Sequence, residues 1–154
     1  GARRPGPRAR EAGLRITVHA GEWGGAQSVR ETLDAYNPPR IGHGVQAISD
    51  PELVARLADT GTVLECCPSS NLVLGVVPNW QSHPLARLRD AGVKVTVSTD
   101  DPPFFNTDMR REFAAVEQHF GWGPAEFAEI TKTALEAAFC DEATRAEISK
   151  QLTT

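Results

Sequence analysis

The alternation of short strand-forming runs with helical patterns is the feature of this sequence that most restricts its fold. Four runs rich in Val, Ile or Thr are bounded by glycine or proline, which is typical of β-strands: residues 15–19, 40–45, 62–66 and 93–99. Helical patterns occupy the gaps, for example between Asp50 and Gly61, which supply a start and a stop signal. Strands separated by helices form βαβ units, so the sequence predicts a parallel sheet with right-handed crossovers.

Helical patterns continue after the fourth strand without another strand, over residues 113–120, 127–137 and 142–152. The fold class we predict is therefore α/β, with four βα units followed by C-terminal helices. Residues 1–10 (GARRPGPRAR) hold four arginines, two prolines and two glycines with no apolar periodicity, so we expect a flexible basic segment there. The folded domain is predicted to be residues 11–154.

Composition narrows the classes of partner. The chain of 154 residues is 40% hydrophobic, enough for one core, and its net charge of −4 favours neither nucleic acid nor an anionic membrane. A small-molecule ligand fits better. The three cysteines form no C-x-x-C pair, so we expect a reducing, cytoplasmic location. No apolar run reaches the roughly 18 residues of a membrane span, and the first residues lack a signal-peptide core, so we expect a soluble protein.

Titratable side chains follow three of the four predicted strands. His19 and Glu22 come at the end of the first strand, His43 at the end of the second, and Asp100 and Asp101 directly after the fourth. Ligands of parallel α/β folds bind at these carboxyl ends. Imidazole and carboxylate groups are the usual ligands of a catalytic Zn²⁺, and a neighbouring acid or base can then move protons. The pattern favours His19 and Asp100 as metal ligands, with Glu22 and His43 in proton transfer.

Three motifs carry a family resemblance: HAGE at 19–22, RIGHG at 40–44 and STDDP at 98–102. Their order and separation, with CPSSN at 67–71 and DDPPFF at 101–105, resemble the metal-dependent adenosine/adenine deaminase family of the amidohydrolase superfamily. The resemblance covers residues 11–152. It implies a (β/α)8 barrel of the TIM type and the hydrolytic removal of an amino group from a purine, with one Zn²⁺ per site.

The resemblance also assigns roles to individual residues. His19 and Asp100 would bind the metal, Glu22 would protonate N1 of the purine ring, and His43 would orient the attacking hydroxide. Protonation of N1 requires a carboxyl group with a raised pKa in a closed site.

Two further residues are expected to contact the substrate. Asp101 would hydrogen-bond N7 of the purine. Gly21 lies between two functional groups and would let the backbone turn close to the ligand.

The sequence departs from the family pattern in one respect. The family's first strand carries an H-x-H pair that supplies two zinc ligands, and this chain contains no H-x-H. A complete barrel takes roughly 250 residues, so the chain corresponds to the C-terminal half and could need the N-terminal half as a partner. The segment PPFFNT at 102–107 tips the prediction toward adenosine as substrate, with conversion to inosine in purine salvage. The alternatives are a related amidohydrolase acting on adenine or another aminated ring, and a half-barrel module without catalysis.

Overall fold

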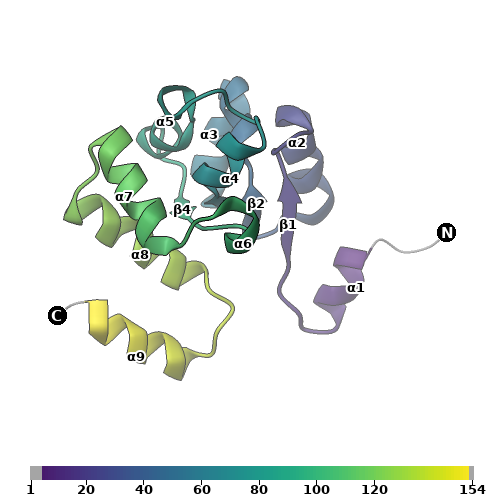
Figure 1. Cartoon of the computed structure of the whole chain (residues 1–154). Coiled ribbons are helices and arrows are strands. Elements are labelled where there is room, and N and C mark those ends of the chain that lie inside the picture. The colour runs from purple at the N-terminus through teal and green to yellow at the C-terminus, as the bar shows by residue number, and fades with distance from the viewer. Residues whose placement is uncertain (1–4, 153–154) are drawn as a thin grey trace.

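A four-stranded parallel sheet forms the centre of the protein, whose computed structural model describes residues 5–152 (Figure 1). The strands follow one another across the sheet in chain order: β1 (Thr17–Ala20), β2 (Arg40–His43), β3 (Val63–Cys66) and β4 (Val95–Val97). Sequential order is that of a barrel wall, whereas a doubly wound sheet reverses its order at a switch point. The four strands agree with those predicted and differ from them only at their ends.

The register of the strands separates an apolar face from a polar face. One aligned row is apolar: Ile41, Leu64 and Val95 belong to the core, and Val18, which is half-buried, continues the row on β1. The next row points to the other face and includes polar groups: His19, Gly42, Glu65 and Thr96. On this second face Thr17 Oγ1 donates to Glu65 Oε2 at 2.9 Å, and Arg40 pairs with the same carboxylate at 3.3 Å. The polar face is therefore the interior side of the barrel wall.

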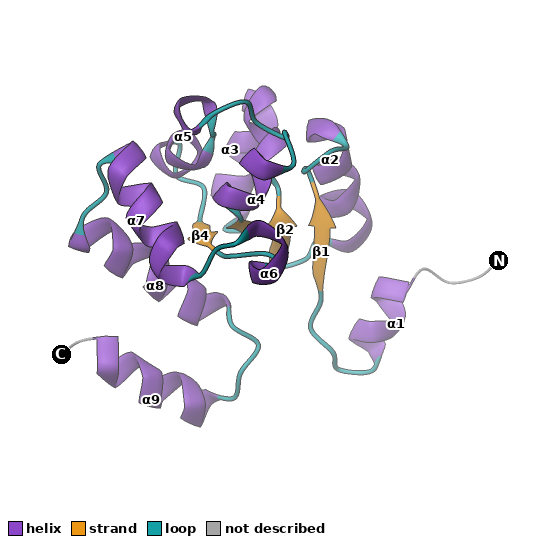
Figure 2. Ribbon diagram, viewed as in Figure 1, coloured by secondary structure: helices purple, strands orange, loops and turns teal. Residues whose placement is uncertain are grey.

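Helices connect the strands and cover the apolar face (Figure 2). The connecting helices are α2 (Gly25–Tyr36), α3 (Pro51–Thr60) and α5 (Leu85–Asp90). In α3 the Asp50 carboxylate accepts the N–H of Leu53 and Gly61 ends the helix in a left-handed conformation, as the start and stop signals predict. The core between these helices and the sheet includes Val29, Leu33, Ile41, Leu53, Leu57, Leu64, Leu85 and Leu88.

Four short helical elements were not predicted: η1 (Val45–Ser49), α4 (Pro68–Val73), η2 (Trp80–Ser82) and α6 (Pro102–Phe105). Three of them follow strands at the end of the sheet where the titratable residues lie, and η1 is the one that follows β2. The element α4 follows β3, and α6 follows β4. Each is too short to show a helical repeat in the sequence.

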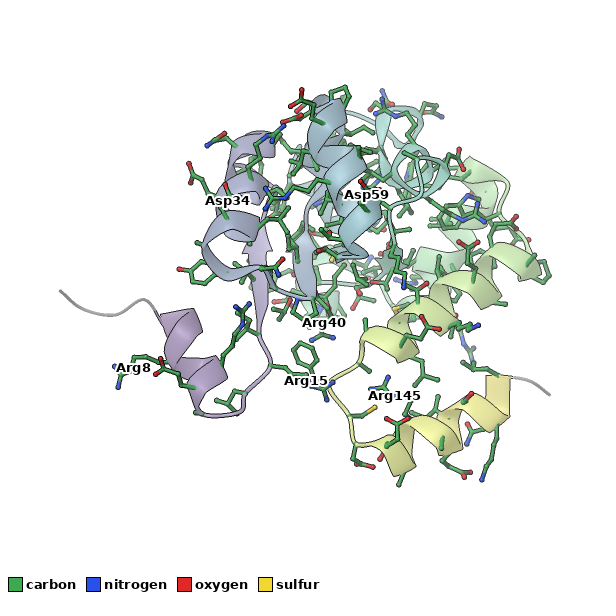
Figure 3. All side chains as sticks on the ribbon, turned by 180° about the vertical axis from the view of Figure 1, so that it is seen from behind. Arg8, Arg15, Asp34, Arg40, Asp59 and Arg145 are labelled. Carbon is green, nitrogen blue, oxygen red and sulfur yellow. The ribbon has the colours of Figure 1, made fainter. Side chains whose placement is uncertain are left out.

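The C-terminal helices are α7 (Met109–Phe120), α8 (Pro124–Ala137) and α9 (Glu142–Leu152), and α8 packs against β4. Arg145 of α9 donates to the carbonyl groups of Leu135, Glu136 and Ala138 at the end of α8. Figure 3 shows Arg145 on the same side of the molecule as Arg15 and Arg40. Hydrogen bonds from α9 thus satisfy carbonyls that the last turn of α8 leaves open.

The structure differs from the prediction for residues 1–10. Residues 1–4 lie outside the described residues, but α1 (Pro5–Glu11) is helical. Arg10 Nη2 donates to the carbonyl of Asn37 at 3.0 Å, which joins α1 to the end of α2. A proline at the first helical position is compatible with a helix, because no N–H is needed there. In residues 5–152, no helix is long and apolar enough to cross a membrane.

Candidate active site

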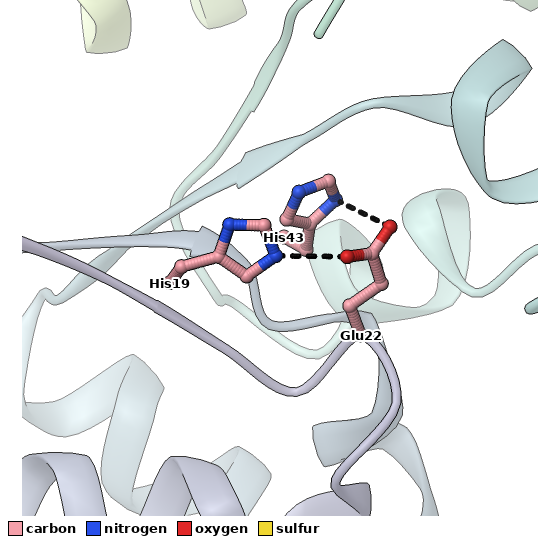
Figure 4. Close-up of side chains that lie close together, drawn as sticks. All are labelled: His19, Glu22 and His43. Carbon is pink, nitrogen blue, oxygen red and sulfur yellow. Dashed lines mark hydrogen bonds and ion pairs between the residues drawn. The ribbon is translucent and has the colours of Figure 1, made fainter.

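Two histidines and a glutamate meet at the carboxyl ends of β1 and β2 (Figure 4). His19 Nε2 lies 2.8 Å from Glu22 Oε2, and His43 Nδ1 lies 3.7 Å from Glu22 Oε1. The two imidazole rings are tilted by 43° with their centroids 4.3 Å apart. The structure therefore brings together three of the residues that the sequence singles out.

These three side chains differ in their exposure. The side chain of His19 is 64% exposed, whereas those of Glu22 and His43 are only 7% and 4% exposed. Burial lowers the pKa of the His43 imidazole, and the Glu22 carboxylate opposes this shift. Glu22 Oε1 is buried without a hydrogen-bond partner among the described residues. The cluster thus holds a polar group that is open to an additional ligand.

Asp100 reaches the same site from the end of β4. Its Oδ2 atom accepts a hydrogen bond from Ser70 Oγ at 2.7 Å and lies 3.9 Å from His43 Nε2. The Asp100 side chain is 32% exposed. Cys67 lies near both groups, and burial raises the pKa of its thiol. His19 and Asp100, the predicted metal ligands, are therefore both neighbours of His43.

Left-handed backbone marks two of these residues. His43 has a φ of 63° and Asp100 a φ of 59°, values that residues with a side chain seldom adopt. Such conformations cost on the order of 1–3 kcal/mol each and cluster at functional sites, although Asn37 and Asn106 adopt them here as ordinary helix C-caps. The chain leaves β2 at His43 and turns toward α6 at Asp100, so the strain accompanies the placement of both side chains in the site.

Gly21 occupies a position that only glycine fits. Its φ is 70°, and an added Cβ would lie 2.4 Å from Val29 Cγ2 and 2.9 Å from Gly44 Cα. The Gly21 N–H donates to Ser28 Oγ at 2.9 Å, and its carbonyl accepts the N–H of Gln46 at 2.9 Å. Gly21 therefore forms the tight turn that carries Glu22 back toward His19, and its contact with substrate stays a prediction.

Asp101 lies at the rim of the site. It precedes α6, and its carbonyl accepts the N–H groups of Phe104 and Phe105 at 3.1 Å. The residue is exposed. Asp100 and Asp101 thus occupy different environments, the first bonded to Ser70 and the second open to solvent.

Two buried residues near His43 were not assigned to the site from the sequence. Asn71 Nδ2 lies 3.3 Å from His43 Nδ1, and His83 Nε2 lies 3.2 Å from Asn71 Oδ1. His83 lies just before α5, and its Nδ1 atom accepts the N–H of Leu85. The CPSSN motif was the available signal for Asn71, but nothing local in the sequence links it to His43.

Sequential βα units with histidines and carboxylates at the strand ends define part of a barrel of the TIM type, in which functional residues lie at the carboxyl face of the sheet. The match to a sequence profile gives a more specific assignment than the fold. The chain belongs to the adenosine deaminase family, whose sequence profile matches residues 7–154.

Curated relatives and solved structures agree with this assignment. An adenine deaminase from Rhizobium johnstonii is 61% identical over 137 residues, which are 89% of this chain and 42% of that protein. The adenine deaminase of Agrobacterium fabrum is 55% identical over 144 residues, which are 94% of this chain and 44% of that protein. The crystal structure of an adenine deaminase from Arthrobacter aurescens matches with a TM-score of 0.90 and 33% identity, covering 96% of this chain and 45% of that one.

A zinc-bound amidohydrolase from Burkholderia ambifaria matches with a TM-score of 0.83 at 28% identity, over 94% of this chain and 41% of that one. The resemblance to the deaminase family and the predicted partial TIM-type barrel are confirmed by these matches. The chain spans less than half the length of the relatives it matches.

The prediction of adenosine as the substrate is wrong. The relatives at 57–61% identity are named adenine deaminases. The segment PPFFNT, which had suggested the nucleoside, forms α6 and the loop after it. Thr107 in this segment donates to the buried carboxylate of Glu112 at 2.6 Å, so it links the loop to α7. Thr107 thus has a structural contact in this segment, and the segment gives no information on a sugar.

Proposed function

We propose that this chain is the C-terminal part of a zinc-dependent enzyme that removes the amino group of adenine by hydrolysis and releases ammonia. The observation that carries the proposal is the gathering of His19, Glu22, His43 and Asp100 at the carboxyl end of one parallel sheet. The names of the most similar relatives support the free base as substrate.

The donor atoms of the site are of the kinds that bind zinc, and His43 is common to the two clusters that contain His19 and Asp100. Ligand atoms of His19, Glu22 and His43 lie within 4.8 Å of one another, and so do those of His43, Cys67 and Asp100. Imidazole nitrogen and carboxylate oxygen are common zinc ligands. Glu22 Oε1, which has no hydrogen-bond partner among the described residues, is an acceptor available to a further ligand. A zinc ion held by His19 and Asp100 would supply the Lewis acidity that makes water nucleophilic near neutral pH.

The remaining side chains would act on the substrate. Glu22 is buried beside the two histidines and would deliver a proton to N1 of the adenine ring. His43, neutral because of its burial, would hold the attacking oxygen by a hydrogen bond. Asp101 would bind N7 at the exposed rim, and the backbone at Gly21 would approach the ring closely.

The complete zinc site requires ligands in addition to those that these residues supply. The family resemblance places two further zinc ligands in an H-x-H pair, which the 154 residues do not contain. The edge strands β1 and β4 each have only one neighbour in the sheet of the described residues. We propose that a segment bearing the H-x-H pair completes both the barrel and the zinc site.

A chimera tests this function. The N-terminal part of the Rhizobium johnstonii adenine deaminase, fused ahead of these 154 residues, should deaminate adenine to hypoxanthine with the release of one ammonia. Adenosine serves as the competing substrate, and a Glu22→Gln version of the chimera serves as the control. A chimera that binds zinc but prefers adenosine, or that leaves both substrates unchanged, would overturn the proposal.

A further inference from the structure

A line of buried hydrogen bonds runs from the start of α5 to His43. The backbone N–H of Leu85 donates to His83 Nδ1 at 3.2 Å, His83 Nε2 lies 3.2 Å from Asn71 Oδ1, and Asn71 Nδ2 lies 3.3 Å from His43 Nδ1. The side chains of His83, Asn71 and His43 are all buried. Neither His83 nor Asn71 takes part in the proposed chemistry.

The direction of each bond in this line follows from its first member. A backbone N–H can only donate, so Nδ1 of His83 must be an acceptor without a proton. The single proton of a neutral imidazole then lies on Nε2 of His83 and is donated to Asn71 Oδ1. Burial and the charge of Arg87 lower the pKa of His83 to about 4, which agrees with a neutral ring.

The same reasoning continues to His43. Once its Oδ1 atom accepts from His83, the amide of Asn71 can only present its NH₂ group to His43. Nδ1 of His43 is then the acceptor, and its ring proton lies on Nε2. That atom faces Asp100 Oδ2 at 3.9 Å, on the metal-binding side of the site.

We propose that Asn71 and His83 are positioning residues that fix His43 in the tautomer with its proton on Nε2. The inference rests on the proposed function for its consequence: His43 then acts as a hydrogen-bond donor toward the reacting oxygen, and not as a base that removes a proton from it. The tautomer of His43 ultimately depends on the backbone N–H of Leu85, which can only donate to His83. Tautomer control of this kind determines which side of an imidazole is available for chemistry.

Ser70, which precedes Asn71 in the sequence, also supports a positioning role for α4. Ser70 donates to Asp100 at 2.7 Å, so adjacent residues of α4 hold the side chains at the ends of β2 and β4. The element is itself tied to α7, because the N–H of Ser69 donates to Glu112 Oε2 at 3.3 Å. α4 thus has the rigid placement that a positioning role requires.

Nitrogen-15 NMR of the 154-residue chain tests the proposal without any turnover. The chain has 4 histidines, and the couplings between ring nitrogens and carbon-bound protons distinguish the two tautomers of each. We expect the Nε2–H tautomer at both His43 and His83. Asn71→Asp is close in shape to the native residue but offers His43 an acceptor in place of a donor, so it should remove the Nε2–H pattern from His43.

Substitutions at His83 supply the rescue test. His83→Leu breaks the line and should leave His43 with a mixture of tautomers, whereas His83→Gln can accept from Leu85 and donate to Asn71 and should restore one tautomer. His119→Gln is the control, because His119 stacks on Trp80 and reaches His83 only through the ring contact of Trp80, without a hydrogen bond to the line, so its loss should leave the tautomer of His43 unchanged. Amide spectra report whether each variant is folded.

Two results would overturn the proposal: the Nδ1–H tautomer at His43 in the unmodified chain, or an unchanged His43 pattern in folded Asn71→Asp. If Asn71→Asp does not fold, the tautomer of the unmodified chain and the His83 pair decide the matter. In the zinc-loaded chimera, Asn71→Asp should lower kcat by about 10²-fold or more with little change in KM, since general acid–base and orienting groups have effects of that order. Failure of the chimera to use adenine would count against the function and leave the tautomer result standing.

Discussion

The pH dependence of folding stability should report the burial of His83. Burial, with a smaller effect of the Arg87 charge, lowers the pKa of this imidazole from 6.5 to about 4. Because the pKa is lower in the folded state, the unfolded chain takes up the proton first as the pH falls. The corresponding stability is present above pH 6.5 and is lost progressively toward pH 4, by about 3 kcal/mol in full.

The variant His83→Gln isolates this effect, because it removes the titrating ring and keeps a polar group for both neighbours of His83. Between about pH 7.5 and pH 5.0 the unmodified chain should lose about 2 kcal/mol through His83 alone, since the unfolded imidazole is almost fully protonated at the lower pH and the folded one is not. Urea unfolding of both proteins at the two pH values gives the comparison. The loss should be smaller in the variant by about that amount.

Other titrating groups contribute equally to the two proteins, so the difference between them is the quantity that tests the argument. Equal losses of stability in the unmodified chain and in His83→Gln would refute the idea that His83 is held neutral by burial. The same result would remove the support that this burial gives to the direction of the hydrogen bonds toward His43.

Three further predictions concern the site itself. In the chimera, Glu22→Gln should keep its zinc by metal analysis and lose about 10²–10⁴ in turnover of adenine, because an amide cannot deliver the proton that a carboxylic acid delivers; near-normal turnover would exclude Glu22 as the acid. Asp100→Ala should lower zinc content, whereas Asp101→Ala should keep zinc and raise KM for adenine; equal metal loss in both would contradict their separate roles. Gly21→Ala should destabilise the chain by about 2 kcal/mol or more in urea unfolding, because its φ is 70° and the new Cβ would lie 2.4 Å from Val29. Recovery of part of that loss by Val29→Ala would confirm that the clash with Val29 contributes to it. An unchanged unfolding midpoint in Gly21→Ala would exclude the clash.

Much of the fold could be predicted because its signals are local. The β-branched runs and the start and stop residues of α3 lie within a few positions of the elements they specify, and all four strands appear where the sequence places them. The element α4 is only 6 residues long, fewer than two turns, so no apolar repeat can reveal it. The helix α1 was missed for a different reason, because its contact with Asn37 depends on tertiary structure.

The location of the site could be predicted from the sequence, but the hydrogen-bond partners of its side chains could not. Parallel topology alone requires the ends of β1, β2 and β4 to lie at one edge of the sheet, which brings His19, His43 and Asp100 together. The partners of each side chain depend on atoms that are distant in sequence. Asn71 and His43 are 28 positions apart, and the bond between them exists only because α4 folds back over the end of β2.

The helix α4 bonds to both of the left-handed residues at the strand ends, His43 and Asp100. Each left-handed residue costs on the order of 1–3 kcal/mol, which surrounding contacts must offset. Asn71 and Ser70 provide those contacts, one for each strained residue. Because both come from the same six-residue helix, a change that displaces α4 would release two active-site side chains together, so stability and catalysis are coupled through this element.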